Sequence, residues 1–404
     1  MNPFLVVRAT IARHLGTYAL FVLLVALATA IGIGITAQEA ALRTGSARAA
    51  DKFDLVVAAP GSQTDVVLAA IYLRPGTVPL LDPSAVGKAL AEPHARISAP
   101  LGFGDNVGGA PIVGTVAPFV EHLSGGLQQG RLFASEGEAV VGAANALAVG
   151  QSFRAEHGTH HDDDDAGDHR EHPATLTVVG RMKPTGTPWD NAVIVPIEFI
   201  WRVHGLPNGH AEGDSRIGAP FDPTRLPGAP AIVIKPDSIN AAYGLRNTYR
   251  TPSSMAFFPA EALIRLYDVL GDIRALMSAL ALATQALVVL AMLAGVMAIL
   301  TLHRRQFAVL RALGAPRLYI FLCVWTQIAF VAGAGATIGL LLGAGAAAAV
   351  SHLITRATGI VLTARIGADE LLLMGGMIGF GLIVATVPAF LVYRRPIAQS
   401  LTSP

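Results

Sequence analysis

The segment HRRQFAVLRALGAPR, residues 303–317, decides how the rest of this sequence is interpreted. Its spacing predicts a short amphipathic helix with Phe307, Leu310 and Leu313 on or near one side and arginines on the other. Gly314 and Pro316 are expected to end this helix. Because so short a helix cannot form a domain alone, we expect it to lie on a membrane surface or in a groove of a cytoplasmic partner protein.

The overall composition indicates a membrane protein. The chain has 404 residues, of which 52% are hydrophobic and 14% are charged. Its mean hydropathy is +0.53, which is too apolar for an ordinary soluble protein of this length. The net charge is +1 and no basic block lies outside the flanks of the apolar segments, so the sequence does not indicate a nucleic-acid-binding surface. The lone cysteine, Cys323, cannot form an intrachain disulfide.

Four windows are long enough for transmembrane helices and contain no Asp, Glu, Lys or Arg. They are residues 18–37, 275–302, 318–351 and 371–393. A secretory signal has an apolar core of about 7–15 residues. The first window is longer, which favours an uncleaved membrane anchor.

Basic residues beside these windows predict the orientation, because cytoplasmic flanks are enriched in Lys and Arg. The relevant residues are Arg8, Arg13, Arg304, Arg305, Arg311, Arg317, Arg394 and Arg395. Alternation then places residues 39–274 and the short loop 356–370 outside. The predicted fold is an α-helical membrane protein with four helices in a 1+3 arrangement and a large outer domain.

The large outer segment is predicted to be an α+β domain. Its β-branched runs, at residues 53–59, 175–182, 191–197 and 231–236, predict strands. Residues 64–73 and 83–92 predict helices between them. The Gly-, Pro- and Asp-rich residues 203–230 predict an irregular surface loop.

Apolar residues at three- and four-residue steps predict a stalk helix that begins near Glu261 and runs into the second window. These residues are Leu263, Leu266, Leu270, Ile273 and Met277. The same pattern is compatible with a seam for a neighbouring helix or with packing on the outer domain, and the sequence leaves both open.

Small and polar residues inside the windows predict close helix packing. The glycines concerned are Gly335, Gly339 and Gly343 in the third window and Gly375 and Gly379 in the fourth. Gln285 and Gln327 are suited to hydrogen bonds between helices. No ionisable residue lies at mid-window, so an ion-translocation site is not expected.

The run HGTHHDDDDAGDHREH, residues 157–172, is rich in metal-ligating side chains. The candidate ligands are His157, His160, His161, Asp168, His169 and His172. Imidazole and carboxylate suit Zn²⁺, and a loop of low complexity favours weak, exchangeable binding. A solvated acidic loop without a physiological metal is the alternative interpretation.

Two enzymatic functions are disfavoured by missing motifs. The sequence has no HExxH pair, which argues against a metallohydrolase, and no GxxxxGK[ST] phosphate-binding loop. A metal-dependent membrane enzyme would also need ordered ligands with an open coordination position. We therefore expect that any ATP-driven work requires a separate ATPase subunit.

Three segments resemble permease subunits of the FtsX-like/MacB family of ABC transporters. They are RRQFAVLRALGAPRLYIF at 304–321, FDLVVAAPGSQTDVVLAAIY at 53–72 and GRMKPTGTPWDNAVIVP at 180–196. The last two look like the branch with a MacB-type periplasmic domain. The resemblance, together with the 1+3 layout, covers nearly the whole chain. Gln306 departs from the family, in which an acidic residue is common at this position.

The resemblance implies a homodimer in the bacterial inner membrane, with a periplasmic domain and two cytoplasmic ATP-binding subunits. Family members work by mechanotransmission toward a periplasmic or lipoprotein partner. The loop 304–315 would be the coupling helix. Its contact residues would be Arg304, Arg305, Phe307, Leu310, Arg311, Leu313 and Gly314.

The substrate is left open by this resemblance. Some members of this branch look associated with zinc acquisition, so we expect a role in divalent-metal homeostasis, with Zn²⁺ at the His/Asp-rich loop. The alternatives are an FtsX-like signalling scaffold that activates a periplasmic hydrolase, or a MacB/LolCE-like exporter or lipoprotein extractor.

These expectations divide the chain into consecutive parts. They are an amphipathic segment with the first span at 1–38, the periplasmic α+β domain at 39–260, a stalk helix with the second span at 261–303, the coupling helix at 304–317, the third span at 318–351, a periplasmic loop at 352–370, and the fourth span with a cytoplasmic tail at 371–404.

Overall fold

The structure, a computed structural model, describes residues 3–157, 171–267 and 314–394, and separate helical positions between 275 and 309. The chain divides into two compact units. The helical unit comprises Met1–Arg43, Leu270–Leu353 and Leu362–Pro404, and the α/β unit comprises Thr44–Val269 and Ile354–Val361. The chain therefore passes from one unit to the other at four places.

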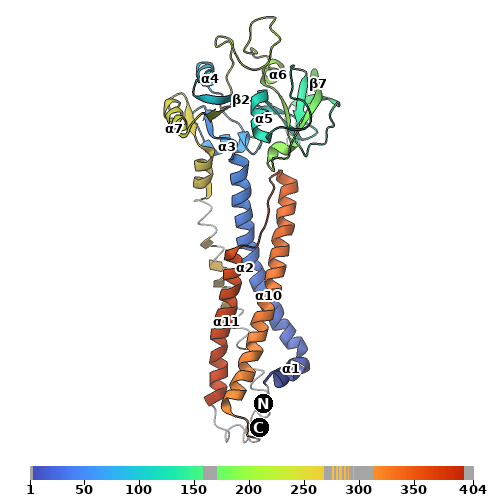
Figure 1. The fold of residues 1–404 in the computed structure, drawn as a ribbon, viewed down its shortest axis with the longest axis vertical. Helices are drawn as coiled ribbons and strands as arrows, with labels where there is room; N and C mark the ends of the chain where they lie inside the picture. The colour runs from blue at the N-terminus through green and yellow to red at the C-terminus, as the bar shows by residue number, and fades with distance from the viewer. Residues whose placement is uncertain are drawn as a thin grey trace, which may run out of the picture. The chain divides into compact units, whose positions relative to one another are not determined.

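In the described part of the chain, the helical unit contains the short helix α1 and three long apolar helices (Figure 1). Their bounds are α1 Pro3–Arg13, α2 Leu15–Ala50, α10 Arg317–Thr358 and α11 Ala368–Arg394. By length and composition, α2 and α10 can each cross a membrane. With 36 and 42 residues they are about 54 and 63 Å long, well beyond the hydrocarbon core of about 30 Å. The window 275–302 lies largely outside the described residues.

The α/β unit contains a ten-stranded sheet in the described part of the chain. The strands are β1 Leu55–Ala58, β2 Ala95–Val107, β3 Ala110–Thr115, β4 Leu127–Gly130, β5 Glu138–Val141, β6 Ser152–His157, β7 Glu171–Met182, β8 Val193–Pro196, β9 Ala231–Pro236 and β10 Met255–Phe257. Their order is β10-β1-β9-β2-β3-β8-β5-β7-β4, and β6 pairs with β2 and β7.

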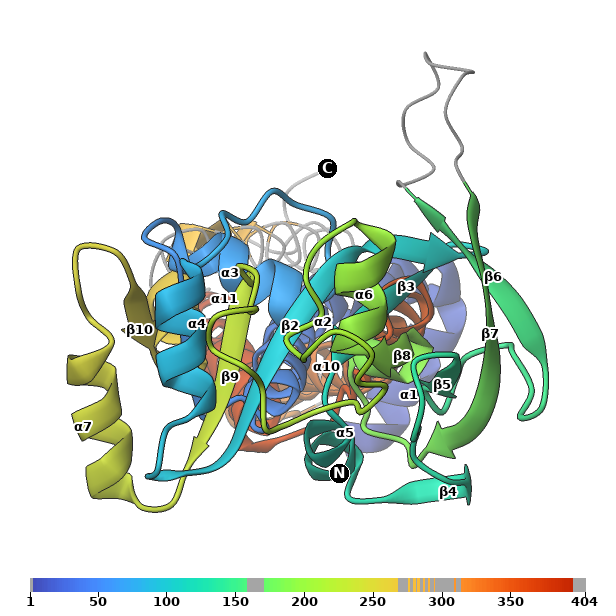
Figure 2. The same cartoon turned by 90° about the horizontal axis from the view of Figure 1, so that it is seen from above.

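One end of this sheet is a βαββαβ arrangement. The strands β10, β1, β9 and β2 are adjacent and antiparallel throughout, which is the strand order of a ferredoxin-like fold. The segment between β2 and β9 is a large insertion that adds β3 to β8 to the sheet. Figure 2 shows α4 beside β2 and β9, and α6 over the inserted strands, in agreement with the packing of these elements.

The helices of the α/β unit begin where the sequence provides side-chain caps. Their bounds are α3 Gln63–Ala70, α4 Pro83–Leu90, α5 Ala117–Ser124, α6 Ile197–Val203 and α7 Ile239–Thr248. Ser62, Asp82 and Ser238 accept hydrogen bonds from the first backbone N–H groups of α3, α4 and α7, which satisfies donors that a helix otherwise leaves free.

The predicted elements of the outer segment are confirmed. The four β-branched runs form β1, β7, β8 and β9, and the two predicted helices form α3 and α4. Residues 204–230 carry no helix or strand beyond an isolated bridge at Ala229. This loop is less superficial than its composition suggested, because His210 is only 3% exposed and Leu226 is 6% exposed.

The core of the α/β unit is centred on three aromatic rings from distant parts of the chain. Phe53, Phe119 and Trp189 are each at most 2% exposed. Their ring centroids are 5.6 to 6.0 Å apart, and two of the three pairs meet edge to face. This is a favourable geometry for aromatic packing, and it joins the residues that follow α2 to the inserted part of the sheet.

Candidate functional site

The residues that join the helical unit to the α/β unit form the first candidate site. We call this set the anchor region. It comprises residues 44–53, 259–267 and 354–361, together with Tyr72 and the turn Thr185–Asp190, all within the α/β unit. Each of the three chain segments is continuous with a part of the helical unit.

The first two segments of the anchor region are linked by tyrosine hydroxyls. Tyr72 donates a hydrogen bond to the backbone oxygen of Ser46 over 3.1 Å. The hydroxyl of Ser46 in turn hydrogen-bonds that of Tyr267. Burial, and after it the nearby Tyr267, raises the pKa of Tyr72, so this phenol stays neutral and able to donate. Ser46, near the end of α2, is therefore hydrogen-bonded both to Tyr72 and to Tyr267 of the helical segment 259–267.

A second set of contacts fastens residues 259–267 to α7. The Arg246 guanidinium lies 3.1 Å from the Glu261 carboxylate and 4.9 Å from the centre of the Phe258 ring. Ala262 and Leu263 are buried in the core of the α/β unit. Cation–π and ionic contacts at one position restrict the start of this helix more than either alone.

The third segment, 354–361, pairs with the turn Thr185–Asp190. The backbone N–H of Val361 donates to the oxygen of Gly186 over 3.0 Å, and Ile360 packs against the core. Gly359 has a φ of +73°, and a Cβ there would lie 3.1 Å from the Cα of Pro188. This close approach suits glycine.

Asp190 holds the turn in shape. Its carboxylate accepts hydrogen bonds from the N–H and hydroxyl of Thr185 and from the N–H of Gly186, each over 2.8 Å. Asp190 is 7% exposed. Because the residue before Asp190 is the core Trp189, the turn connects the third segment directly to the aromatic centre. The sequence alone does not indicate this role of Asp190, because no local pattern shows which segment the turn contacts.

The glycines predicted to pack in the third window lie against α2. Cβ atoms built on Gly335, Gly339 and Gly343 would lie 2.6 to 2.7 Å from atoms of α2, namely Val25 Cβ, Ala26 O and Thr29 Cβ, and Ala30 O. Any side chain at these positions would therefore force the helices apart. We call this contact the glycine seam.

A hydrogen bond between side chains flanks the glycine seam at each end. The Tyr18 hydroxyl donates to Gln327 Oε1 over 2.6 Å, and the Ser351 hydroxyl donates to Gln38 Oε1 over 3.2 Å. From one end to the other, residue numbers rise along both helices, so α2 and α10 run parallel. Gln327 is thus placed in an interhelical hydrogen bond.

The other predicted packing glycines are placed differently. Nothing in the described part of the chain lies within 4 Å of a Cβ built on Gly375 or Gly379 of α11. Two residues further on, a Cβ on Gly381 would lie 3.1 Å from Ala332 of α10. The contact of α11 with α10 is therefore made by another glycine of the same helix.

Most predicted coupling residues lie outside the described residues. These are Arg304, Arg305, Phe307, Leu310, Arg311 and Leu313. Gly314 is described and has a φ of +95°, a backbone conformation that favours glycine. It comes shortly before the start of α10 at Arg317.

The candidate metal ligands His160, His161, Asp168 and His169 also lie outside the described residues. His157 ends β6 and His172 lies in β7. These strands pair antiparallel, with Glu156 opposite Glu171, so the His/Asp-rich run connects two adjacent strands. Among the residues that the structure describes, no group of three metal-ligating side chains converges.

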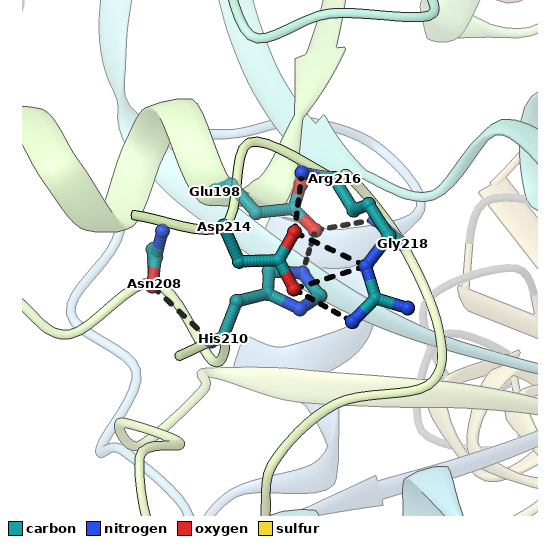
Figure 3. Close-up of polar contacts among 6 residues, drawn as sticks. All are labelled: Glu198, Asn208, His210, Asp214, Arg216 and Gly218. Carbon is teal, nitrogen blue, oxygen red and sulfur yellow. Dashed lines mark hydrogen bonds and ion pairs between the residues drawn. The ribbon is translucent and has the colours of Figure 1, made fainter. Parts of the chain in front are cut away.

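A second site, which the sequence did not indicate, surrounds Glu198 on α6 (Figure 3). Glu198 Oε1 lies 3.4 Å from His210 Nε2 and accepts a hydrogen bond from the N–H of Gly218 over 2.5 Å. Glu198 and His210 are 1% and 3% exposed. Burial raises the pKa of Glu198, since a carboxylate loses hydration there. Both residues look like ordinary surface residues in the sequence.

Comparison with known proteins bears on the helical unit. No curated protein matches the chain. Among solved structures, one similar chain is the extracellular domain of the noncanonic ABC-type transporter YknZ from Gram-positive bacteria, with 10% identity and a TM-score of 0.28, covering 50% of this chain and 98% of that one. The FtsX-like permease C-terminal family model matches residues 277–400. The C-terminal part of this chain is thus similar to the C-terminal domain of FtsX-like permeases.

Proposed function

We propose that this chain is the permease subunit of an ATP-binding cassette transporter that works by mechanotransmission. ATP binding by separate cytoplasmic subunits would move the membrane helices, and these would move the α/β unit outside the membrane. The anchor region is the observation that carries this proposal. A folded domain attached by one flexible linker could not follow such a movement.

The anchor region is suited to transmit force because its three segments enter one packed core. Phe53, Leu263 and Ile360 contact the same hydrophobic cluster. Close-packed protein interiors have low compressibility, so they move as a unit and deform little. A displacement of α2 or of residues 354–361 is therefore expected to displace the α/β unit as a whole.

The parallel glycine seam supports the proposed topology of four spans in a 1+3 arrangement. Two parallel helices that both cross a membrane require an odd number of crossings between them. Residues 275–302 are the apolar window between α2 and α10 that is long enough. With arginines on the inner flanks, the α/β unit is periplasmic in a bacterial inner membrane.

The partners follow from the similarity of residues 277–400 to FtsX-like permeases. We infer a homodimer with two cytoplasmic ATPase subunits and a periplasmic or lipoprotein partner. The chain has no GxxxxGK[ST] motif, so nucleotide hydrolysis is assigned to the partner. Residues 304–314 would contact that ATPase, with apolar side chains in its groove and arginines at the rim.

The double substitution Leu310→Asp and Arg311→Glu tests this proposal. It introduces a carboxylate at Leu310, where the proposed contact with the ATPase is apolar, and it replaces the positive charge of Arg311 with a negative one. ATPase activity of the reconstituted complex in nanodiscs is expected to fall to the level of the ATPase subunits alone. Hydrogen exchange at residues 354–361, which we expect to change when a non-hydrolysable ATP analogue binds to the wild type, should no longer respond.

Arg250→Glu is the matched control, since it reverses the charge of an exposed arginine outside the anchor region and should preserve both responses. Full ATPase stimulation by the double variant would refute the coupling role of the loop. An unchanged exchange pattern at 354–361 in the wild type would refute mechanotransmission while leaving the permease assignment intact.

We further propose that the transporter serves divalent-metal homeostasis, with zinc captured by the His/Asp-rich run. Its placement between the adjacent strands β6 and β7 supports this proposal, because paired strands keep both ends of a ligand-rich loop close together. Asparagine at all five histidines should weaken zinc binding by about tenfold or more, measured by calorimetry, since imidazole is a preferred zinc ligand. These are His157, His160, His161, His169 and His172.

Asparagine at Asp162, Asp163, Asp164 and Asp165 is the matched control and should reduce affinity less. If the histidine variant binds zinc as tightly as the wild type, the proposed zinc capture by these histidines is refuted. The permease proposal would be unaffected by that result.

A further inference from the structure

The loop of residues 204–230 joins two parts of the α/β unit. Near its start, Gly209 approaches Trp201 of α6, where a Cβ would lie 3.3 Å from the indole ring. Near its end, Pro223 and Leu226 lie 3.5 and 3.6 Å from a Cβ built on Gly87 of α4. The loop therefore bridges the inserted part, through α6, and the βαββαβ part, through α4.

One buried pair holds the first half of this loop to α6. His210 Nε2 lies 3.4 Å from Glu198 Oε1, and the N–H of Gly218 donates to the same oxygen over 2.5 Å (Figure 3). The loop thus reaches Glu198 from both sides. The His210 ring also packs on Phe221, with 5.3 Å between centroids, which keeps the imidazole beside the carboxylate.

The charged groups around the pair come from the loop and from α6. Asp214 and Arg216 form a bidentate ion pair, with distances of 2.6 and 2.9 Å to Asp214 Oδ2. The hydrogen bonds from Arg216 lower the pKa of Asp214 to about 2, so Asp214 stays ionised and faces His210 with a constant charge. On α6, Arg202 is bound to Glu136 over 2.6 Å, and His204 beyond it lies 3.8 Å from Asp105 of β2.

We propose that Glu198 and His210 form a pH-sensitive latch that fastens the loop 204–230 to α6 and so sets how firmly the two parts of the α/β unit are joined. Glu198 is the titrating group. In the closed loop its side chain is buried, whereas in an opened loop it would be hydrated.

The direction of the pH dependence follows from the raised pKa of Glu198 in the folded protein. The closed loop binds a proton more tightly than the open loop, so opening releases a proton at pH values between the two pKa values. The latch is fully stable below the ordinary glutamic acid pKa of about 4.5. As pH rises through the raised pKa, the equilibrium constant for closing of the loop falls. For one proton it falls by at most a factor of about ten per pH unit.

Hydrogen exchange of peptides covering residues 204–230 tests the latch in the full chain in detergent micelles. After correction for intrinsic exchange, protection in the wild type should fall between pH 5 and pH 8. Glu198→Gln keeps an acceptor for Gly218 and His210 but cannot titrate, so the pH-dependent fall in protection that Glu198 causes should be lost. Asp222→Asn changes an exposed carboxylate of the same loop and should keep the wild-type slope.

If the protection of residues 204–230 in the wild type does not change with pH, that result alone overturns the proposal. Equal slopes in the wild type and Glu198→Gln would overturn it as well, provided that peptides from β1 and β9 show that the variant is folded. Neither result depends on the ATPase partner, so the latch and the proposed transport function fail separately.

Discussion

At the scale of residues, single side chains determine the shape of the backbone at two places in the α/β unit. Arg181 donates to four backbone oxygens, those of Gly142, Ala143, Asn145 and Leu147, over 2.6 to 3.2 Å. Asp190 does the converse and accepts from the turn that precedes it. Each satisfies several backbone groups that irregular structure would otherwise leave without partners.

Asp190→Asn should destabilise the α/β unit by about 1–3 kcal/mol. The amide would present an NH₂ group to one of the N–H donors of Thr185 or Gly186, leaving a buried donor unsatisfied. Thermal unfolding measures the loss, and hydrogen exchange should show faster opening at residues 354–361. The exposed Glu121→Gln is the control, with an expected change within about 0.5 kcal/mol. Equal melting temperatures for both variants would contradict this role of Asp190.

At the scale of elements, helix length and helix contact are set by different features. The apolar window predicted for the first span ends near residue 37, yet α2 continues to Ala50. The following residues QEAALRTGSARAA contain several good helix formers and no proline, so the helix continues into the α/β unit. The glycine seam, in contrast, is a property of both helices together.

Gly339→Leu is expected to separate α2 from α10, because a Cβ at this position would lie 2.6 Å from Ala26 O and Thr29 Cβ. Overpacking of this kind lowers stability by about 1–3 kcal/mol. The melting temperature of the purified protein in detergent should fall accordingly. Gly345→Leu, on the same helix but with nothing described within 4 Å, should melt like the wild type. If both variants melt alike, the seam does not stabilise the helical unit.

At the scale of the whole molecule, the chain passes between its two units four times. Each passage is continuous with a region that the sequence predicted to span the membrane. The end of α2 and residues 259–267 meet at Ser46 and Tyr267, and residues 354–361 meet the turn beside Trp189. Residues 354–361, between the third and fourth windows, therefore belong to the α/β unit, which their sequence alone did not indicate.

Much of the local structure could be predicted from the sequence. Strands β1, β7, β8 and β9 and helices α3 and α4 follow from side-chain patterns and turn residues within about ten positions of each other. The long apolar helices follow from composition. These features depend on the periodicity of side chains along the backbone and on the removal of apolar side chains from water. Both are visible within a few consecutive residues.

The tertiary structure alone decided which of these elements meet. It placed β9 between β1 and β2 across an insertion of more than 100 residues, joined Val361 to Gly186, and buried Glu198 against His210. Contacts between distant segments, or with an irregular loop such as the one that holds His210, leave no local pattern, because they are determined by how the whole core packs. For that reason the long apolar helices and the α/β domain could be predicted from the sequence, while the anchor region and the latch became visible only in the folded chain.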